Sequence, residues 1–190
     1  MTNKDFILAS QSPQRIALLH QVACEPKEII PADIDESCLP HEKALPYVRR
    51  MAWEKAKHVA DLRPNENILA CDTIVVANNK ILHKAKNENE QREIMQVLSG
   101  RAHRVISSVC LINKKGKLSQ RTVTTKIVMK KLTASEIDEY VTSGEWQGVC
   151  GYKIEGLLAA YVTKIIGSYS GVVGLPLNET VNLLRGEGVK

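Results

Sequence analysis

Residues 68–77 read ILACDTIVVA, a run of apolar and β-branched residues interrupted only by Asp72 and Thr73. A run of this length and composition is typical of a strand that is buried on both faces of a sheet. A carboxylate inside such a strand is costly to bury unless it is paired, binds a metal or faces a cleft. Asp72 is therefore a candidate metal ligand or general base, or else an aspartate that bonds backbone at a strand edge.

Helical and extended patterns alternate on both sides of this strand. The expected elements are a strand at 5–9, helices at 13–20, 43–62 and 88–98, a hairpin formed by 103–112 and 121–132, a helix at 134–143 and a C-terminal helix that ends near 184. Ser12, Thr133 (in a capping box with Glu136) and Asn178 are the predicted N-caps, and Gly100 and Gly144 are the predicted helix ends. The alternation predicts an α/β fold with a mixed, partly antiparallel sheet flanked by helices.

The composition is that of an ordinary globular protein. Of the 190 residues, 44% are hydrophobic and 25% charged, and neither a leader pattern nor a membrane-spanning run is present, so we expect a cytoplasmic protein without membrane contact. The five cysteines form no Cys-x-x-Cys pair, which favours reduced thiols over disulfides or zinc. The net charge of +5 suits an anionic ligand, but aromatic residues make up only 4%, which disfavours a nucleic-acid surface built on base stacking.

The turn SQSPQR, residues 10–15, joins the first strand to the first helix. A helix N-terminus carries unpaired N–H groups and a partial positive charge, both of which suit a phosphate. Ser10 and Ser12 add hydroxyl donors, and Arg15 adds a permanently charged guanidinium fork. The alternative is that Ser12 only caps the helix and Arg15 is solvated.

Several other polar residues each have both a chemical and a structural interpretation. The doublet Asp35–Glu36 offers oxygen ligands of the kind that Mg²⁺ binds together with substrate phosphates, and Lys55 and Lys84 are point charges for phosphate oxygens. Each of these is, taken alone, most often a surface charge. The stretch SGRAHRV (99–105) places a histidine at the entry to a strand, where it is either a proton carrier or a hydrogen-bonding side chain.

Four stretches together resemble motifs of the Maf family of nucleoside triphosphate pyrophosphatases. LASQSPQR (8–15) matches Leu-Ala-Ser-x-Ser-Pro-x-Arg, CDTIVV (71–76) matches Ala-Asp-Thr-Val-Val, SGRAHRV (99–105) matches Ser-Gly-Arg-x-His, and VVGLPL (172–177) matches Val-x-Gly-Leu-Pro-Leu. Their order and spacing also agree. The resemblance spans nearly the whole chain, which we therefore expect to form one Maf-like domain over residues 1–190.

This resemblance implies a function and a set of site residues. The family hydrolyses nucleoside triphosphates to the monophosphate and pyrophosphate, depends on Mg²⁺ or Mn²⁺, and consists of two-lobed, often homodimeric proteins with the active site in the cleft. The resemblance gives Asp72 the role of proton acceptor and places the family's functional lysines at Lys55 and Lys84. The metal ligands are then Asp72 with the doublet Asp35–Glu36. The substrate-binding positions fall on Ser10, Ser12, Gln14, Arg15, Thr73, Ser99, Arg101, His103 and Glu155.

Two segments depart from the family pattern. The sequence HKAK (83–86) keeps Lys84 but lacks the glycine and proline beside it, and the segment 148–156 lacks a lysine and has Glu155 in place of glutamine. The altered segment 148–156 motivates one alternative to a house-cleaning pyrophosphatase, namely a catalytically weakened nucleotide-binding regulator connected with cell division, whereas the intact Asp72, Lys55 and Lys84 speak against it.

The preferred base follows less directly from the resemblance. The family's dTTP/UTP branch has arginine and glutamine at positions 14 and 155, and its 7-methyl-GTP branch has a bulky aromatic residue and a glutamate. Gln14 fits neither branch and Glu155 fits the second. We favour dTTP and UTP because the aromatic platform that a cationic purine requires is absent. A 7-methyl-GTP pyrophosphatase is the second alternative.

Overall fold

The computed structural model describes residues 4–189 and has a seven-stranded mixed sheet at its centre. The strand order is β2-β1-β3-β5-β6-β7, with β4 paired to one end of β3. The strands are β1 (Lys4–Leu8), β2 (Pro26–Ile29), β3 (Ile68–Ala77), β4 (Lys80–Leu82), β5 (Ala102–Ile112), β6 (Leu118–Met129) and β7 (Val162–Ile166). β1 is parallel to β2 and β3, and the other pairs are antiparallel. The predicted α/β fold with a mixed sheet is therefore confirmed.

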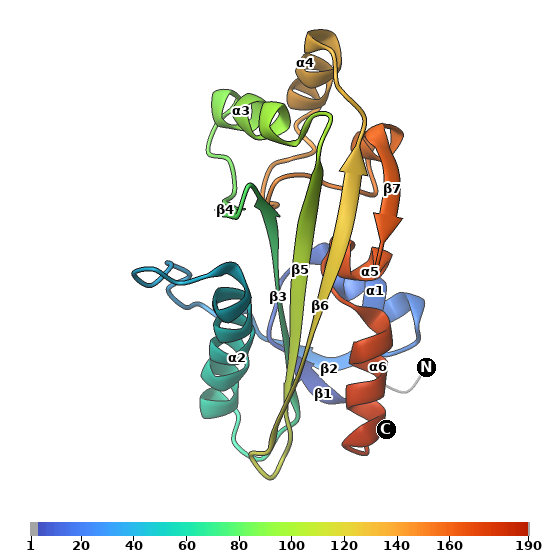
Figure 1. Cartoon of the computed structure of the whole chain (residues 1–190). Coiled ribbons are helices and arrows are strands. Elements are labelled where there is room, and N and C mark those ends of the chain that lie inside the picture. Colours follow the sequence, from blue (N-terminus) through green and yellow to red (C-terminus); the bar gives the residue numbers. More distant parts are fainter. Residues whose placement is uncertain (1–3, 190) are drawn as a thin grey trace.

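Helices cover both faces of this sheet and its far end. They are α1 (Pro13–Gln21), α2 (Ala44–Leu62), α3 (Glu88–Leu98), α4 (Ala134–Ser143), a 3-10 helix η1 (Leu157–Tyr161), α5 (Tyr169–Val173) and α6 (Leu177–Gly186). In Figure 1, α2 lies on one side of the long strands and α1 and α6 lie on the other. α3 and α4 cover the end of these strands that is at the top of the view. Separate hydrophobic clusters fill the two ends of the molecule, as expected for two lobes joined by long strands.

The alternation of β3 decides which side chains meet which helices. Ala70 and Ile74 pack toward α2, whereas Leu69 and Cys71 pack toward α1 and α6. This is the period of two that a strand imposes on its side chains. A fully buried side chain as large as that of Leu69 contributes about 1.5–3 kcal/mol to folding. The same alternation directs Asp72 toward α2.

The edge of β3 that faces β1 is only partly paired. β1 pairs with β3 at Ile68 and Leu69, and β4 pairs with it at Val75–Ala77. Within residues 4–189, positions 70–74 therefore have no neighbouring strand on that edge. β1 ends beside this gap and leads directly into α1, so the gap and the N-terminus of α1 come together.

Most of the predicted elements are confirmed, and one predicted cap is wrong. β3, α3 and α4 have the expected bounds, Ser12 is the N-cap of α1, and Thr133 and Glu136 form the capping box. Asn178 is not the N-cap of α6, because the helix already begins at Leu177 and Pro176 precedes it. The sequence patterns did not predict β2, β7, η1 or α5.

Candidate active site

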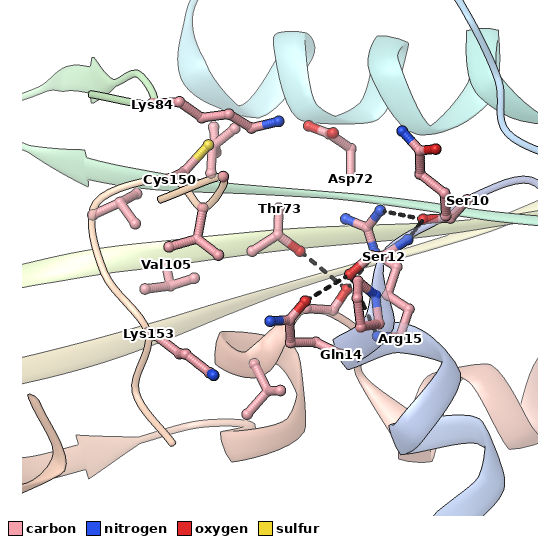
Figure 2. Close-up of a pocket in the computed structure, with 18 of the residues that line it drawn as sticks. Ser10, Ser12, Gln14, Arg15, Asp72, Thr73, Lys84, Val105, Cys150 and Lys153 are labelled. Carbon is pink, nitrogen blue, oxygen red and sulfur yellow. Dashed lines mark hydrogen bonds between the residues drawn. The ribbon is translucent and has the colours of Figure 1, made fainter. Parts of the chain in front are cut away.

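A cavity of about 490 Å³ opens at the unpaired edge of β3. The turn at 10–15, the middle of β3, the segment 148–155 and the residues before α6 form its walls, as Figure 2 shows. This volume is within the usual range for small-molecule sites. Ten of the predicted site residues line the cavity: Ser10, Ser12, Gln14, Arg15, Glu36, Lys55, Asp72, Thr73, Lys84 and Glu155.

Two carboxylates converge on the ammonium group of Lys55. The Nζ atom lies 2.7 Å from Asp72 Oδ1 and 2.8 Å from Glu36 Oε1. Lys55 reaches Asp72 because α2 packs on the face of β3 to which even-numbered residues point. Tyr47, about two turns earlier on α2, donates from its hydroxyl to the carbonyl oxygen of Glu36 at 2.8 Å. The backbone that carries Glu36 is thereby held against α2.

Burial and charge act in opposite directions on this cluster. Burial alone lowers the pKa of Lys55, but the Asp72 carboxylate and the hydrogen bonds to both acids outweigh it, so that the pKa is raised. Burial likewise raises the pKa of Glu36, yet the contact with Lys55 brings the net value below the ordinary one. Lys55 is therefore charged, and Glu36 is ionised, at neutral pH. The second oxygen of each carboxylate has no hydrogen-bond donor within residues 4–189.

The turn at 10–15 holds its arginine in one orientation. The backbone N–H of Arg15 donates to Ser12 Oγ, its Nη1 donates to Ser10 Oγ at 3.0 Å, and its Nε donates to the carbonyl oxygen of Gly174 at 3.0 Å. Ser12 Oγ in turn donates to Gln14 Oε1 at 3.1 Å. The guanidinium group is thus fixed at the cavity wall beside the N-terminus of α1, an arrangement suited to a phosphate.

The carbonyl oxygen of Gly174 connects three elements. Besides Arg15, it accepts hydrogen bonds from Thr73 Oγ1 at 3.2 Å and Cys71 Sγ at 3.3 Å. The φ angle of Gly174 is 142°, a conformation that a side chain would oppose. The stretch VVGLPL therefore has a structural reason for its glycine, which lets one carbonyl fix both β3 and the turn of α1.

Several cavity residues carry charge or polarity that the sequence motifs did not single out. Tyr47, Cys150 and Lys153 line the cavity together with the predicted Lys84. Burial raises the pKa of the Cys150 thiol, which keeps it protonated at neutral pH. Within residues 4–189, neither Lys84 nor Lys153 forms an ion pair. Both ammonium groups are therefore available to an anionic or polar ligand.

Comparisons with known proteins identify the family of the chain. The model of the family described as "Maf: Maf-like protein" matches residues 5–187. The chain belongs to the Maf family. Curated relatives include "dTTP/UTP pyrophosphatase" of Mesorhizobium japonicum, 47% identical over 97% of this chain and 92% of the relative. The protein of the same name from Paramagnetospirillum magneticum is 46% identical over 96% of this chain and 97% of the relative.

A solved structure, a nucleoside-triphosphatase / dITP/XTP pyrophosphatase from Mycobacterium abscessus, shows a more distant similarity. It is 14% identical, with a TM-score of 0.44, and the match covers 68% of this chain and 76% of that chain.

Of the Maf stretch SGRAHRV, Val105 lines the cavity and the other six residues do not. Ser99 Oγ accepts a hydrogen bond from the backbone N–H of Leu132 at 2.8 Å, and Arg101 is exposed and donates to the carbonyl oxygen of Val97 at 3.1 Å. Both contacts fix the junction between α3 and β5. The structure thus does not bring Ser99 and Arg101 together with the other predicted substrate-binding residues.

His103 is buried behind the cavity wall. Its Nε2 atom lies 2.5 Å from the hydroxyl of Tyr152, which lines the cavity, and its Nδ1 atom has no hydrogen-bond partner within residues 4–189. Burial lowers the pKa of His103 to about 4, so the ring is neutral at neutral pH. His103 therefore contacts, through Tyr152, a residue that itself lines the cavity.

Two of the three predicted metal ligands reach the cavity. Asp35 does not: it is exposed, and its carboxylate accepts from the backbone N–H and the hydroxyl of Ser37, both at 2.9 Å. Glu36 and Asp72 present hard oxygen atoms that face the cavity next to each other. Such a pair fits Mg²⁺ or Mn²⁺, which bind through one or two carboxylates together with substrate phosphates. Within residues 4–189, no group of three or more His, Cys, Asp or Glu residues could hold a metal ion by itself.

None of the helices within residues 4–189 is both long enough and apolar enough to cross a membrane.

Proposed function

We propose that this Maf protein hydrolyses dTTP and UTP to the nucleoside monophosphate and pyrophosphate. The observation that carries the proposal is the position of Asp72, held by Lys55, which also contacts Glu36, on one wall of a cavity whose other wall is the turn with Arg15. The names of the relatives agree with the predicted nucleoside triphosphate pyrophosphatase activity, and they supply the pyrimidine substrates.

In this proposal Asp72 is the general base. A water molecule attacks the α-phosphorus, its proton passes to the free carboxylate oxygen of Asp72, a new P–O bond forms and the bond from the α-phosphorus to the bridging oxygen breaks. Pyrophosphate leaves with the bonding electron pair. Lys55 orients the carboxylate through its 2.7 Å contact.

Cations and N–H groups around the cavity then stabilise the phosphates. Arg15 is oriented by Ser10 and Gly174 and lies at the N-terminus of α1, where the helix dipole also favours a negative charge. Lys84 lies on the Asp72 side of the cavity, as Figure 2 shows, where it can neutralise negative charge next to the reacting phosphorus. These groups oppose the charge that develops on the leaving pyrophosphate.

Glu36 and Asp72 are the residues that would hold Mg²⁺ or Mn²⁺. The bound ion would withdraw charge from the phosphate oxygens. We also include in the proposal a homodimer, which the family resemblance implies, and a cytoplasmic location, which the scattered cysteines favour. Light scattering on the purified protein tests the first, since a single mass near 21.1 kDa excludes the dimer.

A nucleotide panel tests the proposed function. We expect pyrophosphate and monophosphate from dTTP and UTP in the presence of Mg²⁺ or Mn²⁺, and little release from purine nucleotides. The matched control is Asp72→Asn, which keeps the side-chain shape but removes the base. A preference for 7-methyl-GTP over UTP, or equal turnover by wild type and Asp72→Asn, would overturn the proposal.

A further inference from the structure

Two oppositely charged side chains line the cavity two residues apart and do not neutralise each other. Lys153 and Glu155 both contribute to its wall. Within residues 4–189, neither forms an ion pair with the other or with any other residue. Opposite charges this close along the chain ordinarily have the opportunity to pair. Here each remains available to a ligand in the cavity.

The segment that carries the two side chains is held on both sides. The backbone N–H of Lys153 donates to the hydroxyl of the buried Tyr140 at 3.0 Å, and the N–H of Leu157 donates to Glu145 Oε2 at 2.8 Å. Gly156 lies so close to the Glu145 carboxylate that a Cβ atom there would collide with it. These contacts fix the backbone on either side of Glu155, so Lys153 and Glu155 are presented to the cavity by an anchored segment.

The position of Lys153 separates it from the reacting end. In Figure 2, Lys153 and Gln14 lie on the side of the cavity opposite Lys84 and Asp72. The partly buried side chains of Val172 and Val173 line the same cavity. When the α-phosphate lies at Asp72, a nucleotide that fills the cavity places its base on the side where Lys153 is found. An apolar surface with a few charged groups suits a planar heterocycle.

We infer that Lys153 and Glu155 act as a pair that recognises the base, an inference that rests on the proposed function. The ammonium of Lys153 donates to a ring carbonyl oxygen, and the carboxylate of Glu155 accepts from the adjacent ring N–H. Uracil and thymine present such a carbonyl beside an N–H. A single glutamine amide can both donate and accept, whereas a carboxylate only accepts. Two side chains thus provide the donor and the acceptor that one amide would supply.

The test uses steady-state kinetics of the full chain with UTP. Lys153→Met keeps the apolar stem and removes the donor, and we expect it to raise KM and lower kcat/KM by about 10-fold or more, because the base carbonyl loses its partner. Adding Glu155→Gln to that variant returns a donor, and we expect kcat/KM to recover to within about threefold of wild type. Lys115→Met is the matched control, since Lys115 is exposed in the β5–β6 turn and the variant loses the same charge.

A modified nucleotide distinguishes recognition from a structural role. Wild type is expected to prefer UTP over N3-methyl-UTP, and Glu155→Ala to lose most of that preference. If wild type does not hydrolyse UTP, the proposed function fails and the inference with it. If wild type hydrolyses UTP but Lys153→Met stays within twofold of it, or the double variant is no better than the single one, the inference alone is overturned.

Discussion

Replacing Lys55 by methionine removes the one ammonium group that Asp72 and Glu36 share. The change keeps the length of the apolar stem within α2, so the packing against β3 is largely retained. It leaves the carboxylate of Asp72, whose side chain is only 9% exposed, without the cation 2.7 Å away. The two carboxylates then lie near each other with no positive charge between them.

The expected loss of stability follows from burial. Removing one partner of a buried ion pair costs roughly 3–5 kcal/mol, because the other charge remains buried and uncompensated. The side chain of Glu36 is 46% exposed, so its contact with Lys55 adds little. We therefore expect Lys55→Met to lower the free energy of unfolding by about 3 kcal/mol at pH 7.

Urea unfolding followed by circular dichroism measures this loss, with the double variant Lys55→Met/Asp72→Asn as control. The amide carries no charge, so the double variant should be more stable than Lys55→Met alone. A loss below about 1 kcal/mol for the single variant, the magnitude of a surface pair, would refute the reasoning. The same conclusion would follow if Asp72→Asn gave no recovery.

Three further predictions concern single residues. Asp72→Asn should lower kcat for pyrophosphate release by about 10²–10⁴-fold with the fold retained, and turnover within a few-fold of wild type would remove Asp72 from its role as base. Arg15→Ala should raise KM for UTP, and Arg15→Lys should restore it only in part, because an ammonium cannot contact Ser10 and Gly174 as the fork does; equal KM values in all three proteins would speak against a phosphate site. Because burial lowers the pKa of His103 from 6.5 to about 4, the unfolded chain binds the proton first, and stability falls as the pH drops from about 6.5 to about 4. In His103→Asn, the free energy of unfolding measured with urea should fall less over this pH range, by up to about 3 kcal/mol. An equal fall in the variant and in wild type would contradict the assignment.

Elements with strong local signals were predictable from the sequence. β3 has the bounds that its apolar run indicates, and α4 begins at its capping box and ends at Gly144, whose φ angle is 70°. β2 and β7 gave no such signal, because most of their residues are exposed and neither strand shows an alternating pattern. α5 has only five residues, one of them a glycine. These elements depend on contacts that only the folded chain provides.

The candidate site was predictable where one local motif or one misplaced charge marked it. Asp72 stood out as a carboxylate in an apolar strand, and Arg15 as an arginine beside a helix N-terminus. Lys153 gave no signal, since its segment has neither periodicity nor a cap. Sequence proximity was misleading for Asp35, whose neighbour Glu36 reaches Lys55 while Asp35 itself closes a turn on Ser37.

Hydrolysis of UTP in ¹⁸O-labelled water tests the central claim most directly. Attack of water at the α-phosphorus, with Asp72 as base, places the label in the monophosphate and leaves the pyrophosphate unlabelled. Mass spectrometry of the two products after a single turnover shows which phosphorus atom formed the bond to the water oxygen. We predict one ¹⁸O atom in UMP and none in pyrophosphate. Label in the pyrophosphate, or release of orthophosphate in its place, would contradict the account.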